Sequence, residues 1–142
     1  MSDLDPSIIE RSTEKMHIWL KELAAELGVS DRRYAYRALR AVLHTLRDRL
    51  TVESAAAFAS ELPTMIRGIY YEDWNPSRTP LPMRDVEEFL DHVATEGRLG
   101  GRTEASLAVA AVSALLKRHI ASGEIDDVIA VLPERLKKLI AS

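Results

Sequence analysis

Cysteine is absent from the 142 residues of this chain. Disulfides, thiolate metal sites and a cysteine nucleophile are therefore excluded, and a reducing compartment does not harm the protein. The first residues, MSDLDPSIIER, carry acids where a secretory signal carries lysines, and no apolar segment follows them. We therefore expect a cytoplasmic protein without an export signal.

Long hydrophobic runs and an excess of one charge are also missing. The longest uncharged stretch, residues 105–116, has twelve residues, whereas a membrane-spanning helix needs about 20. Acids number 22 and bases 19, a net charge of −3, so no global field attracts the chain to nucleic acid or anionic lipid. We expect neither a membrane nor a nucleic acid as a partner.

Apolar residues are present in the amount and spacing of a folded helical domain. They make up 46% of the chain, which is enough to bury a core, and we expect a single domain over residues 1–142. They recur at helical spacing along most of the chain, which predicts an all-α fold. The pattern indicates a bundle of about eight helices, which end near 27, 50, 62, 71, 97, 121, 132 and 141.

Two boundaries in the first half need separate treatment. The first helix starts near Met16 or as early as Pro6, where Asp5 would cap it. Residues 72–84 contain three prolines, which interrupt regular helix and favour an extended backbone. We interpret this segment as a linker.

The halves on either side of the linker align with each other at an offset of 70 residues, without a gap. Residues 16–71 form repeat 1 and residues 86–141 form repeat 2. Matches fall on expected core positions, and the Leu62-Pro63 pair recurs as Leu132-Pro133. Amphipathic helices align with one another at some offset by chance, but coincident proline breakpoints are not expected from chance alone. The sequence predicts two tandem four-helix repeats related by a pseudo-twofold axis.

Positions that differ between the repeats are candidates for function. The helix near 31–50 carries a basic stripe opposite its apolar face. Its members are Arg33, Arg37, Arg40, His44 and Arg47. Such a stripe fits a phosphate-bearing or acidic partner. The alternative is a solvated face paired with acids elsewhere in the chain. Those acids would be Asp85, Glu87, Glu88 and Asp91.

The corresponding helix of repeat 2, near 102–121, has apolar or small residues at most of these positions, including Leu107, Ala110 and Ala114. We therefore expect this helix to be buried on more than one side. The additional partner is either the first half of the chain or another subunit.

An aromatic cluster ends repeat 1 and has no counterpart in repeat 2. It consists of Arg67, Tyr70, Tyr71 and Trp74. Residues of these types are favoured anchors at protein interfaces. The alternative is that the rings hold the linker against the bundle while Arg67 pairs with an acid. Within the cluster, Gly68 costs a helix roughly 1 kcal/mol, which predicts a close approach by another backbone or a ring.

Catalytic and cofactor signatures are not found. The four histidines lack metal-ligand spacing, and we interpret the best candidate set, Glu88, Asp91 and His92, as a solvated charge cluster. Neither a GxSxG elbow nor a phosphate-binding glycine loop is present. We expect no metal and no cofactor. No residue spacing in the sequence indicates an enzymatic activity.

The segment RALRAVLHTLRDRLTVESAAAFASELPTMIRGIYYEDWNP resembles the core of the bacterial domain-of-unknown-function family 2267. WLKELAAELG before it and GEIDDVIAVLPERL after it extend the resemblance over nearly the whole chain. The resemblance implies a small bacterial cytosolic helical protein and transfers no reaction, cofactor or catalytic residue. The motif positions are Arg47, Arg49, Leu62, Pro63, Arg67, Gly68, Tyr70, Tyr71 and Trp74.

Three classes of function stay open. The first is a non-enzymatic interaction module that self-associates, using the apolar excess of repeat 2 or the aromatic cluster. The second is a binder of a small anionic or apolar ligand in the cleft between the repeats, with Arg67 as the polar anchor. The third is an enzyme, for which no acid, base or nucleophile pair can be named.

Overall fold

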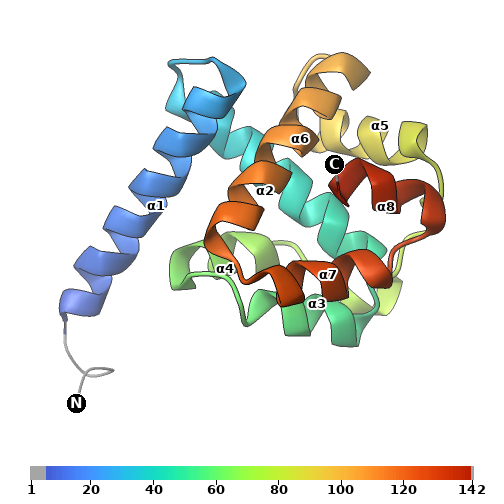
Figure 1. Cartoon of the computed structure of the whole chain (residues 1–142), viewed down its shortest axis with the longest axis horizontal. Coiled ribbons are helices and arrows are strands. Elements are labelled where there is room, and N and C mark those ends of the chain that lie inside the picture. The colour runs from blue at the N-terminus through green and yellow to red at the C-terminus, as the bar shows by residue number, and fades with distance from the viewer. Residues whose placement is uncertain (1–5, 142) are drawn as a thin grey trace.

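A computed structural model describes residues 6–141 and shows an all-α protein, as the apolar periodicity predicts. No strand occurs within these residues. The helices, shown in Figure 1, are α1 (Ser7–Leu27), α2 (Arg32–Arg49), α3 (Val52–Ala59), α4 (Thr64–Tyr71), the short 3-10 helix η2 (Pro76–Arg78), α5 (Val86–Gly97), α6 (Arg102–His119), α7 (Ser122–Ala130) and α8 (Glu134–Ala141).

Local sequence explains most helix ends. The side chains of Asp31, Thr51 and Asp85 each accept a hydrogen bond from a backbone N–H in the first turn of α2, α3 and α5, which satisfies donors that a helix start leaves free. Gly28 ends α1 with a left-handed φ of 70°, a conformation that glycine adopts without a steric penalty. The expected Asp5 cap lies outside the described residues.

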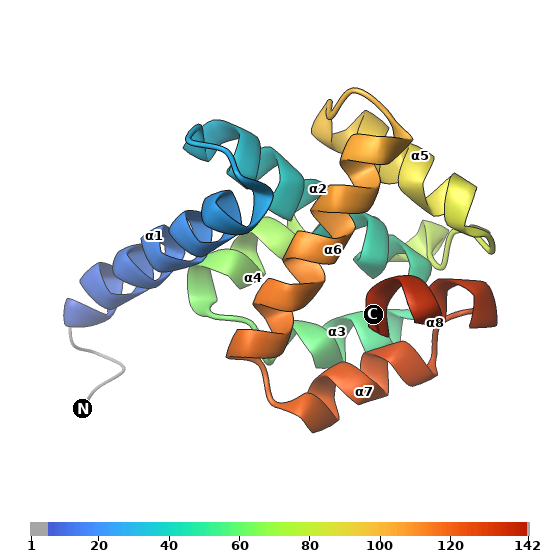
Figure 2. The same ribbon diagram turned by 45° about the horizontal axis from the view of Figure 1, so that its top comes forward.

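The two long helices α2 and α6 lie against each other at the centre of the bundle. α1 packs on α6 and on α2, while α5 packs on α2 and on α6. The short helices α3 and α7 lie side by side at one end of the bundle, whereas α4 packs on α2 and α1, and α8 packs on α6 and α5 (Figures 1 and 2). Trp19, Tyr70 and Phe89 are the largest side chains that are fully buried in this core.

Helix order and helix boundaries recur between the halves at the expected offset. Arg32–Arg49 corresponds to Arg102–His119, and Thr64–Tyr71 corresponds to Glu134–Ala141. Burial recurs as well, because Trp19 and its counterpart Phe89 both have no exposed surface. The rotation that would relate the halves, a pseudo-twofold axis, stays a prediction that superposition of the two halves would test.

One helix breaks the correspondence. α1 has 21 residues, whereas its counterpart α5 has 12. The additional residues 7–15 correspond to 77–85, which lie in the proline-rich linker and contain only the end of η2. Figures 1 and 2 show the first turn of α1 reaching beyond the other helices, while Arg11, Ser12, Glu14 and Lys15 line a gap together with Pro63 and Thr64 at the start of α4. We call residues 7–15 the α1 extension.

Helix lengths and apolarity also bear on the membrane. None of the helices in the described part of the chain combines the length and the apolarity that crossing a bilayer requires.

Candidate interaction surface

The basic stripe of α2 does not form one solvated surface. Arg33, at its start, has an 89% exposed side chain, but His44 and Arg47 are each only 2% exposed. The expectation of a solvated face is therefore wrong for these two residues, because α4 and α5 cover α2 on that side. His44 and Arg47 are therefore enclosed by the fold, whereas Arg33 lies open to solvent.

The partners of the stripe are mostly the ends of neighbouring helices. Arg37 donates from Nε to the carbonyl of Gly97 at 3.1 Å, at the end of α5. Arg47 donates from Nη1 to the carbonyls of Tyr70 and Glu72, each at 2.7 Å, at the end of α4. Carbonyls at a helix end lack partners within the helix and carry the negative end of its dipole. The cations of α2 therefore fasten α4 and α5 to the centre of the bundle.

Arg40 and His44 meet carboxylates, but not the expected ones. The Arg40 guanidinium lies 3.3 Å from Glu72, 3.0 Å from Asp73 and 3.2 Å from Glu96. Burial opposes the charged form of Arg40, but the carboxylates outweigh it and hold its pKa above the ordinary value. The proposed pairing with Asp85, Glu87, Glu88 and Asp91 is wrong, since these acids lie in or before the first half of α5. Arg40 instead meets Glu96 near the end of α5, and Glu72 and Asp73 after α4.

His44 has two hydrogen-bond partners, and both of them are acceptors. Its Nδ1 lies 2.8 Å from the carboxylate of Glu96, and its Nε2 lies 2.7 Å from the carbonyl of Ile69. The ring of His44 therefore links the end of α4 to the end of α5.

The aromatic cluster is assembled in space, but most of its surface is inside the protein. Tyr70 has no exposed surface, and its hydroxyl donates to the carbonyl of Ala55 at 2.8 Å. Tyr71 packs between Tyr70 and Trp74, with ring centroids 5.4 Å and 5.2 Å away. Tyr71 and Trp74 are half-buried, so only their outer parts are available to a partner.

Arg67 and Gly68 have roles that differ from those expected. The Arg67 guanidinium donates to the carbonyls of Ala59 at 3.0 Å and Leu62 at 2.9 Å, at the end of α3. It therefore holds backbone and not an acid. No atom outside the local helix backbone lies within 4 Å of the position that a Cβ would take on Gly68. The expectation of a close approach at Gly68 is wrong.

The extra apolar face of α6 is not covered by the first half of the chain. Leu107 is 61% exposed, and Ala110 is exposed beside it. α1 packs on α6 along another side. Of the two expected partners for this face, the first half is thus ruled out for Leu107.

Further apolar side chains are exposed on α1 and α4, and the sequence reasoning missed them. Ile8, Ile9 and Ile18 on α1 are 40%, 68% and 44% exposed, and Met65 on the neighbouring α4 is 40% exposed. Helical periodicity alone does not reveal their exposure, because it cannot tell where a helix leaves the bundle. The available signal was that the α1 extension corresponds to the linker of the other repeat.

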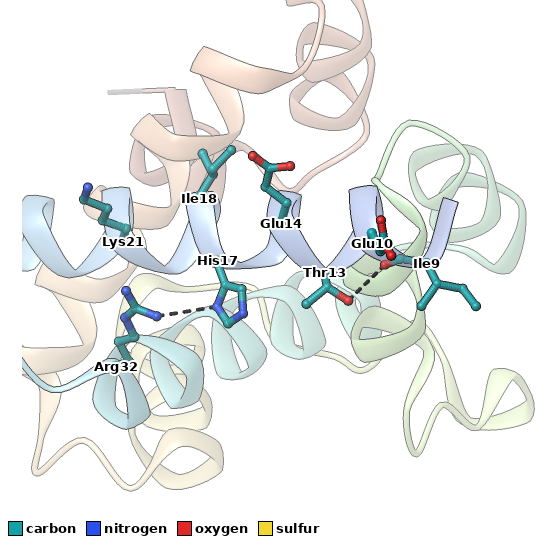
Figure 3. A pocket seen from close by; sticks show the side chains of 8 residues that line it. All are labelled: Ile9, Glu10, Thr13, Glu14, His17, Ile18, Lys21 and Arg32. Atoms are coloured by element: carbon teal, nitrogen blue, oxygen red, sulfur yellow. Dashed lines mark hydrogen bonds between the residues drawn. The ribbon is translucent and has the colours of Figure 1, made fainter. Parts of the chain in front are cut away.

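Figure 3 shows the face of α1 to which Ile9 and Ile18 belong, which we call the α1 face. It is a shallow groove of about 450 Å³. The side chains of Glu14, Ile18 and Lys21 lie along one edge, and His17 and Thr13 lie along the other. Arg32 reaches it from α2, with its Nη1 3.5 Å from Nδ1 of His17. The complete lining is Ile9, Glu10, Thr13, Glu14, His17, Ile18, Lys21 and Arg32.

Charge is divided along the α1 face. Glu10 and Glu14 lie toward the start of α1, whereas Lys21 and Arg32 lie toward its end. Between residues 6 and 141, no ion pair is formed by Glu10, Glu14 or Lys21. The face therefore offers unpaired acids at one end and cations at the other.

The candidate metal ligands do not converge. Asp91 pairs with Arg102, at 2.7 Å and 2.9 Å, and this contact holds the pKa of Asp91 below its ordinary value. Within residues 6–141, no three side chains of the types that hold metal ions are grouped closely enough to do so.

Comparison with known proteins places the bundle in a family. No curated protein matches the chain. The profile of a family described as "Uncharacterized conserved protein (DUF2267)" matches residues 16–139. The match includes all of repeat 1 and nearly all of repeat 2, and it starts at the residue that follows the α1 extension. Because the matched region covers the bundle from Met16 almost to its end, this chain belongs to the DUF2267 family.

Proposed function

We propose that this chain is a non-enzymatic interaction module that associates with further copies of itself. The observation that carries the proposal is the exposure of Ile9 and Ile18, which are 68% and 44% exposed and line the same groove of the α1 face. Exposed apolar side chains that gather on one surface mark contact sites, whereas single scattered ones do not. The absence of cysteine fits a cytoplasmic setting for such a module.

The internal repeat supports the choice of surface. Residues that both repeats share are explained by packing of the bundle, whereas the α1 extension has no helical counterpart. It is also outside the region that the family profile matches. A helix that continues for about two and a half turns beyond its own core contacts gains little stability from the bundle, which fits a role in contacting a partner.

The alternative of a small-ligand site between the repeats has less support. Its expected anchor, Arg67, is engaged with the end of α3. The gap between α3 and α7, lined by Phe58 and Val128 among others, measures about 80 Å³, whereas ligand pockets usually have about 300–1,000 Å³.

Sedimentation velocity over a concentration series tests the proposal. We expect the average mass to rise above the 15.9 kDa of one chain as the concentration increases from about 1 μM to about 500 μM, the range suited to a small interface. A mass that stays at one chain throughout contradicts self-association.

A pair of matched variants identifies the surface. Ile18→Ser removes an exposed apolar side chain from α1, and Leu107→Ser removes one from α6. We expect Ile18→Ser to weaken association and Leu107→Ser to leave it unchanged. The reverse result would retain self-association but move it to the face of α6.

A further inference from the structure

The charges of the α1 face are arranged so that the face is complementary to itself. Acids occupy the half nearer the start of α1, and cations occupy the half nearer its end. When a second copy lies antiparallel to the first, its Lys21 and Arg32 lie opposite Glu10 and Glu14 of the first copy. Its own Glu10 and Glu14 lie opposite Lys21 and Arg32 of the first copy.

We propose, on the basis of the self-association proposed above, that two copies pair through antiparallel α1 helices. Glu10 of one copy faces Lys21 of the other, and Glu14 lies along the edge of the face that meets the same edge, with its Lys21, in the second copy. The pair of Glu10 and Lys21 is centred between residues 15 and 16, which is where the twofold axis passes. A twofold contact must have this property, because every contact occurs twice with the partners exchanged.

Local electrostatics within one copy support this register. Glu10 and Glu14 are four residues apart on a helix, and like charges at this spacing destabilise it slightly. Arg32 donates from Nη1 to Nδ1 of His17 at 3.5 Å, which holds its guanidinium at the other end of the face. Antiparallel pairing places the acids of one copy against the cationic end of the other, which offsets the repulsion between Glu10 and Glu14.

The apolar part of the face fits the same arrangement. Ile18 is near the middle of the paired segment and close to the proposed axis, so the Ile18 side chains of the two copies lie on the same side of the contact. Ile9, 68% exposed, lies on the α1 extension at the outer end of the face. Burial of these side chains supplies attraction, and the charges set orientation and register.

The division of charge favours a second copy over other partners. A uniformly acidic or uniformly basic partner would match one half of the face and repel the other half, which raises the free energy of the complex. A second copy matches both halves.

The size of the contact predicts weak and reversible association. The segment from Ile9 to Lys21 is about 20 Å long at 1.5 Å per residue. A contact of this length between two helices buries less than the roughly 1,200 Å² of a stable specific interface. We therefore expect a dimer that forms only as the protein concentration rises.

Two charge-block variants of the full chain test the pairing. Glu10→Lys with Glu14→Lys makes the face entirely basic, and Lys21→Glu with Arg32→Glu makes it mainly acidic. Each variant alone should associate at least about tenfold more weakly than the original chain, because like charges face each other in the dimer. An equimolar mixture of the two should restore association to within about threefold, since opposite charges then meet at both ends.

A matched control carries the same change of net charge elsewhere. Glu53→Lys with Glu61→Lys alters two exposed acids in and after α3, and association should stay within about twofold of the original chain. Circular dichroism of all variants checks that α1 remains helical, since acids near a helix start also stabilise it through the dipole.

The outcomes separate the two proposals. A dimer that persists in both charge-block variants, or a mixture that stays monomeric although its components are helical, overturns the antiparallel pairing and leaves self-association standing. An original chain that is monomeric at every concentration overturns self-association and the pairing together. If each charge-block variant associates weakly, their mixture associates like the original chain and the Glu53→Lys, Glu61→Lys control is unaffected, the result supports both self-association and the antiparallel pairing.

Discussion

Arg47 is the cation of the basic stripe with the largest number of buried contacts. It is 2% exposed and donates to two carbonyls of the α4 end and to the Asp48 carboxylate. Its repeat counterpart, Lys117, makes the same kind of contact more simply, donating from an exposed position to the carbonyl of Ala141 at 2.6 Å. The same helix end is thus held in both repeats, by arginine inside the protein and by lysine at its surface.

This pair of residues yields a prediction about stability. Arg47→Ala should lower the free energy of unfolding by about 3–5 kcal/mol, because buried acceptors lose a charged donor. Lys117→Ala should lower it by less than about 1 kcal/mol, because water replaces an exposed donor. Urea titration measures both values. Equal losses would show that burial at Arg47 contributes nothing beyond the hydrogen bond itself.

Tyr70 predicts how stability depends on alkaline pH. Burial, followed by the neighbouring Tyr71, raises the pKa of Tyr70 well above its ordinary value. The folded state therefore keeps this proton at a pH at which the unfolded chain releases it, about 10 and above. The free energy of unfolding should be unaffected by Tyr70 below that pH and should fall as the pH rises above it.

Tyr70→Phe separates this effect from those of other groups. The variant should lose about 1 kcal/mol at neutral pH, because the carbonyl of Ala55 loses its donor, but its stability should decline less steeply in alkali. Ultraviolet absorbance of tyrosinate offers a second measurement, in which one of the four tyrosines ionises only as the original chain unfolds. Ionisation of all four before unfolding would contradict a protected Tyr70.

At the level of helices, two glycines mark opposite environments. Gly97, at the end of α5, is buried where α5 meets α2, and a Cβ there would lie 2.9 Å from the Cβ of Ala41. Gly68, within α4, faces open space. The sequence suggested close packing at Gly68, and the close packing is instead found at Gly97.

Alanine at these positions should therefore have effects of opposite sign. Gly97→Ala overfills the crossing of α2 and α5 and should lower the free energy of unfolding by about 1–3 kcal/mol. Gly68→Ala should raise it by up to about 1 kcal/mol, because alanine favours helix and meets no neighbour. Thermal unfolding of the two variants compares them directly, and a stabilised Gly97→Ala would mean that α5 can shift away from α2 without loss.

The helices themselves were predictable because their determinants are local. Asp31, Thr51 and Asp85 cap the helices that follow them. The prolines lie between α-helices or just before them, where the helical spacing of apolar residues is interrupted. The start of α1 was less predictable. Its first turns lack the regular apolar side that identifies Met16 to Leu27, because they have no bundle to pack against.

At the scale of the whole molecule, the features that the sequence did not predict concern which sides of a helix are covered by other helices. A helical pattern shows which side of α2 is apolar, but not that α4 and α5 also cover its cationic side. His44 and Arg47 were therefore expected at the surface and are buried. Conversely, Leu107 was expected to need a partner and has none within the first half of the chain. Both outcomes depend on how the two repeats meet, which no single helix encodes.

The overhang of α1 has a mechanical consequence for any assembly built on it. The helix is held by its buried residues from Met16 onward, with the Trp19 ring stacked on His119 at 4.8 Å. Ile9 lies about 15 Å along the axis from Trp19, so a tilt of about 10° at Trp19 displaces Ile9 by about 3 Å. A small tilt of α1 about its buried residues would therefore produce a larger displacement at its exposed start. In the dimer proposed above, we expect a substitution at His119, remote from the paired faces, to change the angle between the two copies.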